Sequence, residues 1–248
     1  MLKKISSIIL AAGRGKRLKD INYPKSLIKI NKKDTLIDNI INVLENNNIH
    51  DLNIVTGYKK DILKKYLKNK KINFLLNPKW KKTNMVASLM RADKILSKNY
   101  SIISYADIFY KKSAVSLLLK KKHDISITSS TKWKKIWKKR FKDPLMDAET
   151  FDFDNNYFLK EIGKKPKSLN QIKGQYMGLI GISHIGWKKI KLFIKKNKFI
   201  NINKISITEL LSEYIKQHPK SIKVIEYKES FMEIDFKKDN QIKNQLIK

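Results

Sequence analysis

The chain has 248 residues, 42% of them hydrophobic, and its 55 Lys and Arg residues against 22 Asp and Glu give a formal net charge of +33. This apolar content excludes a disordered chain and is enough for a substantial core, while the lack of cysteine excludes disulfides and thiolate metal sites. No run of about 18 apolar residues occurs, so we expect no membrane insertion and a cytoplasmic location.

The first predicted element is a buried strand over Ile5–Leu10, which leads directly into a loop of small and cationic residues. Glycine and alanine let the backbone approach a bound anion, and glycine tolerates the positive φ that such a loop needs. Cations in the loop and shortly after it would neutralise a polyphosphate. We therefore predict a nucleoside triphosphate site formed by Leu10, Ala11, Ala12, Gly13, Arg14, Gly15, Lys16, Arg17 and Lys25.

The spacing of this loop excludes the two commonest phosphate-binding motifs. A P-loop requires Ser or Thr after its lysine, but Arg17 follows Lys16. A dinucleotide-binding loop requires a third glycine at the position that Leu18 occupies. The alternative interpretation is an ordinary strand-to-helix turn in a basic protein.

Strand and helix patterns alternate through the first half of the chain. Apolar runs predict further strands at Leu52–Thr56, Ile72–Leu76, Tyr100–Tyr105 and Asp124–Ser129. Amphipathic segments between them predict helices at Thr35–Asn46, Lys60–Leu67, Asn84–Leu96 and Ser113–Lys122. This alternation indicates an α/β layered fold with a mostly parallel sheet, in which ligands bind at the carboxyl ends of the strands.

The pattern loosens between residues 132 and 171 and then resumes. Later elements are predicted as strands at Gly174–Ile182 and Ile222–Tyr227, helices at Trp187–Lys196 and Ile207–Ile215, and a basic helix after Asp235. Because no internal repeat and no linker is visible, we expect one domain over residues 1–248. The irregular segment is expected to be a small inserted region that binds the substrate.

Two carboxylates stand out because acidic residues are scarce in this chain. Asp107 follows the predicted strand Tyr100–Tyr105, and Asp235 follows a second short apolar run, Phe231–Ile234. Two carboxylates that converge on a triphosphate provide the hard oxygen ligands that Mg²⁺ prefers. The alternatives are a turn or helix-cap role for Asp107 and a cap of the final helix for Asp235.

The loop string L-x-x-G-x-G-x-R, followed by Pro24-Lys25-Ser26-Leu27, resembles the signature of the nucleotidyltransferase family that includes sugar-phosphate, phosphocholine and molybdenum-cofactor nucleotidyltransferases. Asp107 within Tyr105-Ala106-Asp107, and Asp235, match the positions of that family's metal-binding aspartates. The resemblance implies a Rossmann-like three-layer sandwich, an Mg²⁺ cofactor held by Asp107 and Asp235, and a catalytic set of Arg17, Lys25, Asp107 and Asp235. Arg17 is expected on the pyrophosphate side and Lys25 near the α-phosphate.

The segment Asn77-Pro78-Lys79-Trp80, followed by Thr83-Asn84-Met85-Val86-Ala87-Ser88-Leu89, resembles the phosphocholine cytidylyltransferase branch. That branch resemblance favours CTP, with further nucleotide contacts from Tyr58, Asn77, Thr83, Asn84, Ser88, Tyr105 and Ala106. Asn84 and Ser88 lie four residues apart, on one helical face, so both can reach one ligand. The alternative is that Thr83 or Asn84 only caps the helix.

The second substrate is harder to predict. Trp133, Trp137 and Tyr176 are expected to form an aromatic wall, and Asp147 and Glu149 add negative charge, a combination that suits a cationic group. Arg140 is expected to pair with a carboxylate or with the acceptor phosphate. Gln175 and Gly178 occupy positions where the family brings amide and backbone groups to the acceptor. The alternative is that Trp133 and Trp137 pack in the core.

These expectations combine into a cytidylyltransferase that transfers CMP from CTP to a phosphorylated small molecule, with release of pyrophosphate. Residues 1–130 would form the nucleotide-binding half, and residues 131–248 the acceptor-binding half with the second metal ligand. The acceptor stays open among phosphocholine, a phosphorylated amino acid or amide, an aminoalkyl phosphonate and a sugar phosphate. The CDP-activated product would serve surface polysaccharide or lipid decoration.

Two alternatives remain. One is a sugar-1-phosphate nucleotidyltransferase that uses UTP, TTP or GTP. The other, from a different class, is a basic nucleic-acid-binding protein. We expect no specific nucleic-acid partner, because the charge is nearly all lysine spread along the chain, and arginine occurs only at Arg14, Arg17, Arg91 and Arg140. Homodimer formation stays open.

Overall fold

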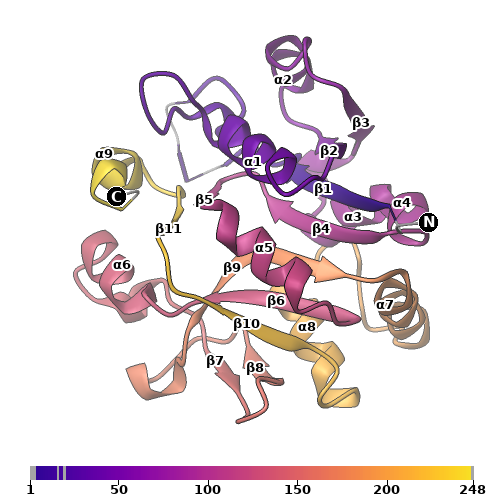
Figure 1. The fold of residues 1–248 in the computed structure, drawn as a ribbon. Helices are drawn as coiled ribbons and strands as arrows, with labels where there is room; N and C mark the ends of the chain where they lie inside the picture. Colours follow the sequence, from indigo (N-terminus) through magenta and orange to yellow (C-terminus); the bar gives the residue numbers. More distant parts are fainter. Residues whose placement is uncertain (1–3, 16, 19–20, 247–248) are drawn as a thin grey trace.

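A computed structural model describes residues 4–15, 17–18 and 21–246 of the protein, so the predicted phosphate contact of Lys16 lies outside the described residues. Its main feature is a seven-stranded sheet in the order β10-β6-β9-β4-β1-β2-β3 (Figure 1). The strands are β1 (Ile5–Ala11), β2 (Asp51–Thr56), β3 (Ile72–Leu76), β4 (Tyr100–Tyr105), β6 (Ile125–Ser130), β9 (Gln175–Ile182) and β10 (Lys223–Tyr227).

The sheet is mostly parallel, as the alternating pattern predicts. β1 pairs in parallel with β2 and β4, β2 with β3, and β10 with β6. β9 is the exception, because it runs antiparallel to both of its neighbours, β4 and β6. The carboxyl ends of β1 and β4 therefore lie side by side, and the residues that follow these two strands meet at one edge of the sheet.

Helices cover both faces of this sheet and make a three-layer α/β sandwich (Figure 1). Successive residues of β1 point to opposite sides, so Ile9 packs under one helical layer while Ile8 and Leu10 pack under the other. The first layer includes α1 (Leu36–Glu45) and α5 (Lys112–Lys120). The second includes α3 (Met85–Leu89), α4 (Asp93–Leu96), α7 (His184–Lys196) and α8 (Ile207–Gln217). A further helix, α2 (Lys60–Tyr66), connects β2 to β3.

Two small antiparallel pairs lie outside the main sheet. β5 (Ile108–Tyr110) pairs with β11 (Phe231–Glu233), which brings the C-terminal segment beside the residues that follow β4. β7 (Phe151–Phe153) and β8 (Leu159–Ile162) form a hairpin within the segment where the sequence pattern loosens. That segment also contains α6 (Trp133–Arg140), which lies next to α9 (Lys237–Leu246).

One predicted helix differs in the structure. The segment predicted as a single helix over Asn84–Leu96 is divided into α3, a 3-10 turn at Met90–Ala92, and α4. Arg91 donates a hydrogen bond from Nε to the carbonyl oxygen of Leu76 in β3, and the Asp93 carboxylate accepts one from the indole of Trp187 in α7. These long-range bonds accompany the break and leave no trace in the local periodicity.

In the described part of the chain, no helix combines the length and the apolar character that crossing a lipid bilayer would need.

Gly186, in the first turn of α7, allows a test of how closely the second helical layer packs on the sheet. A Cβ at Gly186 would lie 2.1 Å from the backbone oxygen of Asp124, whereas a Cβ at Gly13 would have no atom within 4 Å. Gly186→Ala should therefore lower the free energy of unfolding by about 1–3 kcal/mol, as overpacking does. Gly13→Ala should change it by less than about 0.5 kcal/mol. Chemical denaturation of both variants checks this, and equal stabilities would contradict it.

Candidate functional site

A cavity of about 220 Å³ opens where β1 and β4 end. Gly15 has a φ of +67°, and a Cβ there would lie 3.1 Å from Cδ of Lys25, so glycine lets the loop turn closely over this lysine. The structure thus brings the predicted phosphate loop, Lys25 and both predicted metal-binding aspartates together. The cavity is lined by Leu10, Ala11, Gly13, Gly15, Arg17, Lys25, Ser26, Met85, Tyr105, Ala106, Asp107 and Asp235.

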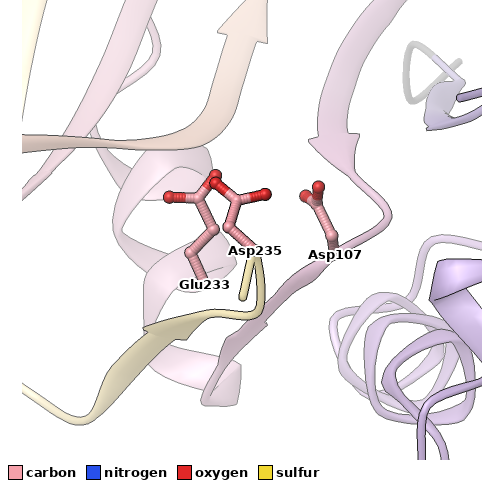
Figure 2. Close-up of side chains that lie close together, drawn as sticks. All are labelled: Asp107, Glu233 and Asp235. Carbon is pink, nitrogen blue, oxygen red and sulfur yellow. The ribbon is translucent and has the colours of Figure 1, made fainter. Parts of the chain in front are cut away.

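Three carboxylates gather beside this cavity, and two of them, Asp107 and Asp235, line it. Asp107 follows β4, Glu233 ends β11 and Asp235 lies two residues further on, and one oxygen from each lies within 4.8 Å of the others (Figure 2). Glu233 is not among the residues predicted from the sequence. The signal was present, because residues two apart in an extended segment project to the same side, so Glu233 accompanies Asp235.

Two cations hold this carboxylate cluster. The ammonium of Lys25 lies 2.7 Å from Oδ2 of Asp107 and also contacts Asp235, and Nη2 of Arg17 lies 2.7 Å from Oδ2 of Asp235. Burial alone would lower the pKa of Lys25, but Asp107 and Asp235 raise it above its ordinary value, so the lysine stays protonated. Ion pairs therefore connect the N-terminal loop and Lys25 to the C-terminal segment.

Repulsion within the cluster acts most strongly on Glu233. Burial and the neighbouring Asp235 and Asp107 raise the pKa of Glu233 well above its ordinary value. Burial also acts to raise the pKa of Asp235, but Lys25 and Arg17 lower it overall. In addition, Oδ1 of Asp107 is buried without a hydrogen-bond partner in the described chain. Hard carboxylate oxygens with an unsatisfied acceptor among them fit a divalent metal ion.

A second cavity, of about 240 Å³, adjoins the first and shares Arg17, Met85, Tyr105 and Asp235 with it. Six of the predicted acceptor residues line it: Trp137, Asp147, Glu149, Gln175, Tyr176 and Gly178. Four further lining residues were not predicted: Met177, Ser206, Thr208 and Glu233. The sequence could have placed Ser206 at the start of α8, because Ser206 and Glu209 have the spacing of a capping box.

The walls of the second cavity are acidic. Burial, followed by the nearby Asp147, raises the pKa of Glu149 above its ordinary value, and the Glu149 carboxylate has no hydrogen bond or ion pair with any described residue. Gln175 fixes the Glu149 backbone instead, donating from Nε2 to its carbonyl oxygen at 2.6 Å and accepting from its N–H at 3.2 Å. A carboxylate without a partner in a cavity wall suits a cationic ligand group.

Two predicted acceptor residues do not line either cavity. Trp133 is 5% exposed and packs in the core, as the core-packing alternative has it; Trp137, 3% exposed, packs in the same core but also lines the second cavity. Arg140 is fully buried behind the wall of the second cavity, where its guanidinium pairs with Asp239. Neither residue is positioned to contact a ligand directly in this structure.

Four residues predicted to contact the nucleotide have hydrogen-bond partners within the protein, at or near α3: Asn77, Thr83, Asn84 and Ser88. Asn77 donates from Nδ2 to Thr83 Oγ1 at 2.9 Å and to Ser88 Oγ at 3.0 Å. Asn84 caps α3 by accepting from the Met85 N–H at 2.8 Å, and it donates to the carbonyl oxygen of Lys204. Their side chains shape this segment and lie outside the cavity lining.

Three more predicted contacts lie at the outer edge of the phosphate loop. The Tyr58 N–H donates to the carbonyl oxygen of the buried Ala12 at 3.0 Å. Arg14 lies over the Tyr58 ring at 5.8 Å, and the same ring meets Trp80 edge-on at a centroid distance of 5.3 Å. None of these three residues lines the first cavity.

Comparison with known proteins gives a family match over residues 7–147, to the MobA-like NTP transferase domain. A CTP:phosphoglutamine cytidylyltransferase from Campylobacter jejuni is 34% identical over 254 residues, which cover 96% of this chain and 98% of the relative. A choline-phosphate cytidylyltransferase from Streptococcus pneumoniae is 37% identical over 101 residues, 40% of this chain and 43% of the relative.

Solved structures show the same fold. The CTP:phosphocholine cytidylyltransferase from Streptococcus pneumoniae superposes with a TM-score of 0.74 at 20% identity, covering 99% of this chain and 100% of the other. A putative glucose-1-phosphate thymidylyltransferase from Bacillus anthracis gives 0.75 at 17% identity, with coverages of 98% and 95%. The Rossmann-like α/β sandwich is thereby confirmed.

The buried lysine of the carboxylate cluster yields a stability prediction. Lys25→Met removes the ammonium between Asp107 and Asp235 and leaves buried carboxylates uncompensated, so the free energy of unfolding at pH 7 should fall by about 3–5 kcal/mol. Lys189→Met is the matched control, since Lys189 pairs with Asp124 at 2.7 Å on the surface and should contribute about 1 kcal/mol or less. Similar losses in urea denaturation would refute the special role of Lys25.

Proposed function

The chain belongs to the family of MobA-like NTP transferase domains, and we propose that it transfers CMP from CTP to a phosphorylated small molecule and releases pyrophosphate. One observation carries the proposal: two adjoining cavities share Arg17, Tyr105 and Asp235, with the carboxylate cluster between them. This arrangement provides one site for a nucleotide and one for an acceptor. The extensive similarity to a CTP-dependent relative supports CTP as the nucleotide.

The reaction needs positioning and charge neutralisation more than proton transfer. A phosphomonoester has a second pKa of about 6, so it is largely dianionic at neutral pH and attacks without a general base. Its oxygen forms a bond to the α-phosphorus of CTP, and the bond from that phosphorus to the oxygen bridging to the β-phosphate breaks. Pyrophosphate leaves with the electron pair. Adjacent cavities that align the two phosphates supply most of this catalysis.

Cationic side chains and backbone groups of the phosphate loop, together with Lys25, are proposed to bind the phosphates of CTP. Arg17 lines both cavities and is 55% exposed, and it is assigned to the pyrophosphate side of the nucleotide. Lys25 lies at the cluster and is assigned to the α-phosphate, while Gly13 and Gly15 leave the loop backbone open to the remaining oxygens. Asp107, Glu233 and Asp235 would hold Mg²⁺, which supplies charge neutralisation when bound.

The second cavity favours an acceptor with an ammonium group. Glu149 offers an unpaired carboxylate, Asp147 lies nearby, and Trp137 adds an aromatic ring to the same wall. A phosphorylated amino acid or amide satisfies these groups, and the name of the Campylobacter relative agrees with that class. Phosphocholine and aminoalkyl phosphonates also carry a cationic nitrogen, so the acceptor panel described below includes them. The product would be a CDP-activated precursor for surface polysaccharide or lipid decoration.

The proposed function is tested by measuring pyrophosphate release with Mg²⁺, each of four nucleoside triphosphates, and a panel of acceptors. The panel contains phosphocholine, phosphorylated amino acids and amides, aminoethylphosphonate and sugar 1-phosphates. We expect release with CTP and an ammonium-bearing acceptor. Release with sugar phosphates alone would replace the proposal with a sugar-1-phosphate nucleotidyltransferase, and binding of nucleic acid without any release would overturn the enzyme assignment.

The acceptor assignment predicts a selective kinetic effect. Glu149→Gln removes the unpaired carboxylate, so the KM for an ammonium-bearing acceptor should rise about tenfold or more, the loss of one charged hydrogen bond. The KM for CTP should stay within about twofold, because Glu149 does not line the first cavity. Glu213→Gln, on the surface of α8, is the control and should change neither constant. Equal increases in both constants for Glu149→Gln would contradict the assignment.

A further inference from the structure

A buried arginine lies behind the two cavities. Arg140 ends α6 and its side chain has no exposed surface. Its Nε lies 3.0 Å from Oδ1 of Asp239 and its Nη2 3.1 Å from Oδ2, so the pair is bidentate. Asp239, in α9, is equally buried. A fully buried, doubly hydrogen-bonded pair fixes the relative positions of α6 and α9.

The same aspartate also holds the backbone of a proposed metal ligand. Oδ2 of Asp239 accepts hydrogen bonds from the backbone N–H groups of Asp235, at 2.9 Å, and Phe236, at 2.8 Å. The Ile234 N–H donates to the carbonyl oxygen of Asp107 at 3.0 Å, which ties the preceding residue to the other side of the cluster. The position of the Asp235 backbone is therefore set by Asp239 and Asp107 together.

The remaining nitrogen of Arg140 lies near two further carboxylates of the site. Nη1 is 3.8 Å from Oδ2 of Asp147 and 3.9 Å from Oε2 of Glu233, and it is buried without a hydrogen-bond partner in the described chain. Asp147 faces the acceptor cavity, and Glu233 belongs to both that cavity and the carboxylate cluster. One guanidinium thus attracts two carboxylates of the acceptor cavity, one of which also belongs to the carboxylate cluster.

We propose that Arg140 and Asp239 are positioning residues, which hold Glu233 and Asp235 in the arrangement that binds a divalent metal and keep that cluster in register with the acceptor cavity. This inference rests on the proposed function for the identity of the site. Groups behind metal ligands orient them, and changing such groups typically weakens metal affinity by about 10- to 100-fold. Neither residue touches the ligand, so both act through Asp235, Glu233 and Asp147.

The test measures the direct binding of Mn²⁺ to the protein by electron paramagnetic resonance, with and without CTP. Two double variants avoid a single unpaired buried charge. Arg140→Met with Asp239→Asn keeps a carbonyl oxygen for the N–H groups of Asp235 and Phe236, whereas Arg140→Met with Asp239→Leu removes it. We expect both to bind Mn²⁺ more weakly than the wild type, with the Leu variant about 10- to 100-fold weaker and the Asn variant between.

Controls separate positioning from general stability. Trp187→Phe removes the 2.7 Å hydrogen bond to Asp93 in the other core layer, so it should lower Tm without changing Mn²⁺ affinity. Arg140→Lys, which keeps the charge but loses the bidentate geometry, should fold and show a several-fold loss of Mn²⁺ affinity. If either double variant fails to fold, the Mn²⁺ affinity of Arg140→Lys tests the positioning role in its place.

The outcomes are distinct. Wild-type Mn²⁺ affinity in the folded Arg140 and Asp239 variants, or an equal loss in Trp187→Phe at matched Tm, would overturn the positioning role. A wild-type protein that binds no Mn²⁺ would overturn it as well. Mn²⁺ binding that depends on Arg140 and Asp239, in a protein that releases no pyrophosphate with any acceptor, would uphold this inference and refute the proposed function instead.

Discussion

Repulsion among carboxylates that share a small volume is the constraint on which this site depends. Asp107, Glu233 and Asp235 lie within reach of one cation, and a fourth carboxylate, Asp147, lies nearby. Such a group is stable only when cations are positioned around it. Lys25 and Arg17 come from one side of the cluster and Arg140 from the other. The fold can be understood as the means of bringing these cations and carboxylates, distant in sequence, to one edge of a sheet.

Most of the framework could be predicted from local pattern. Continuous apolar runs identified the strands of the main sheet within a few residues, because strands buried on both faces carry apolar side chains on both. The Asn84–Leu96 helix was predicted without its break, since Arg91 and Asp93 bond to residues far along the chain. The direction of β9 was likewise inaccessible, because periodicity does not distinguish parallel from antiparallel pairing.

The candidate site was predictable where a residue's role follows from its place at a strand end. Asp107, Asp235 and the phosphate loop lie together for that reason. The sequence did not show how deeply each side chain is buried. Arg140 was predicted to touch the acceptor, but α9 covers it and supplies Asp239. Glu233 was missed because it was interpreted as part of an apolar strand. Asn77 has polar partners within the protein that a linear motif does not reveal, whereas the helix cap by Asn84 was one of the alternatives that the sequence offered.

The pairing of β5 with β11 also has a consequence for synthesis on the ribosome. Domains begin to fold as the chain emerges, with N-terminal parts first. The phosphate loop and Lys25 are made early, but their carboxylate partner Asp235 lies 210 residues after Lys25. Until residues 231–239 have emerged, a nascent chain that is already strongly basic displays this loop with its cations only partly neutralised. Cellular polyanions would then compete for the loop, so the site is completed only late in synthesis, when Asp235 pairs with Lys25 and Arg17.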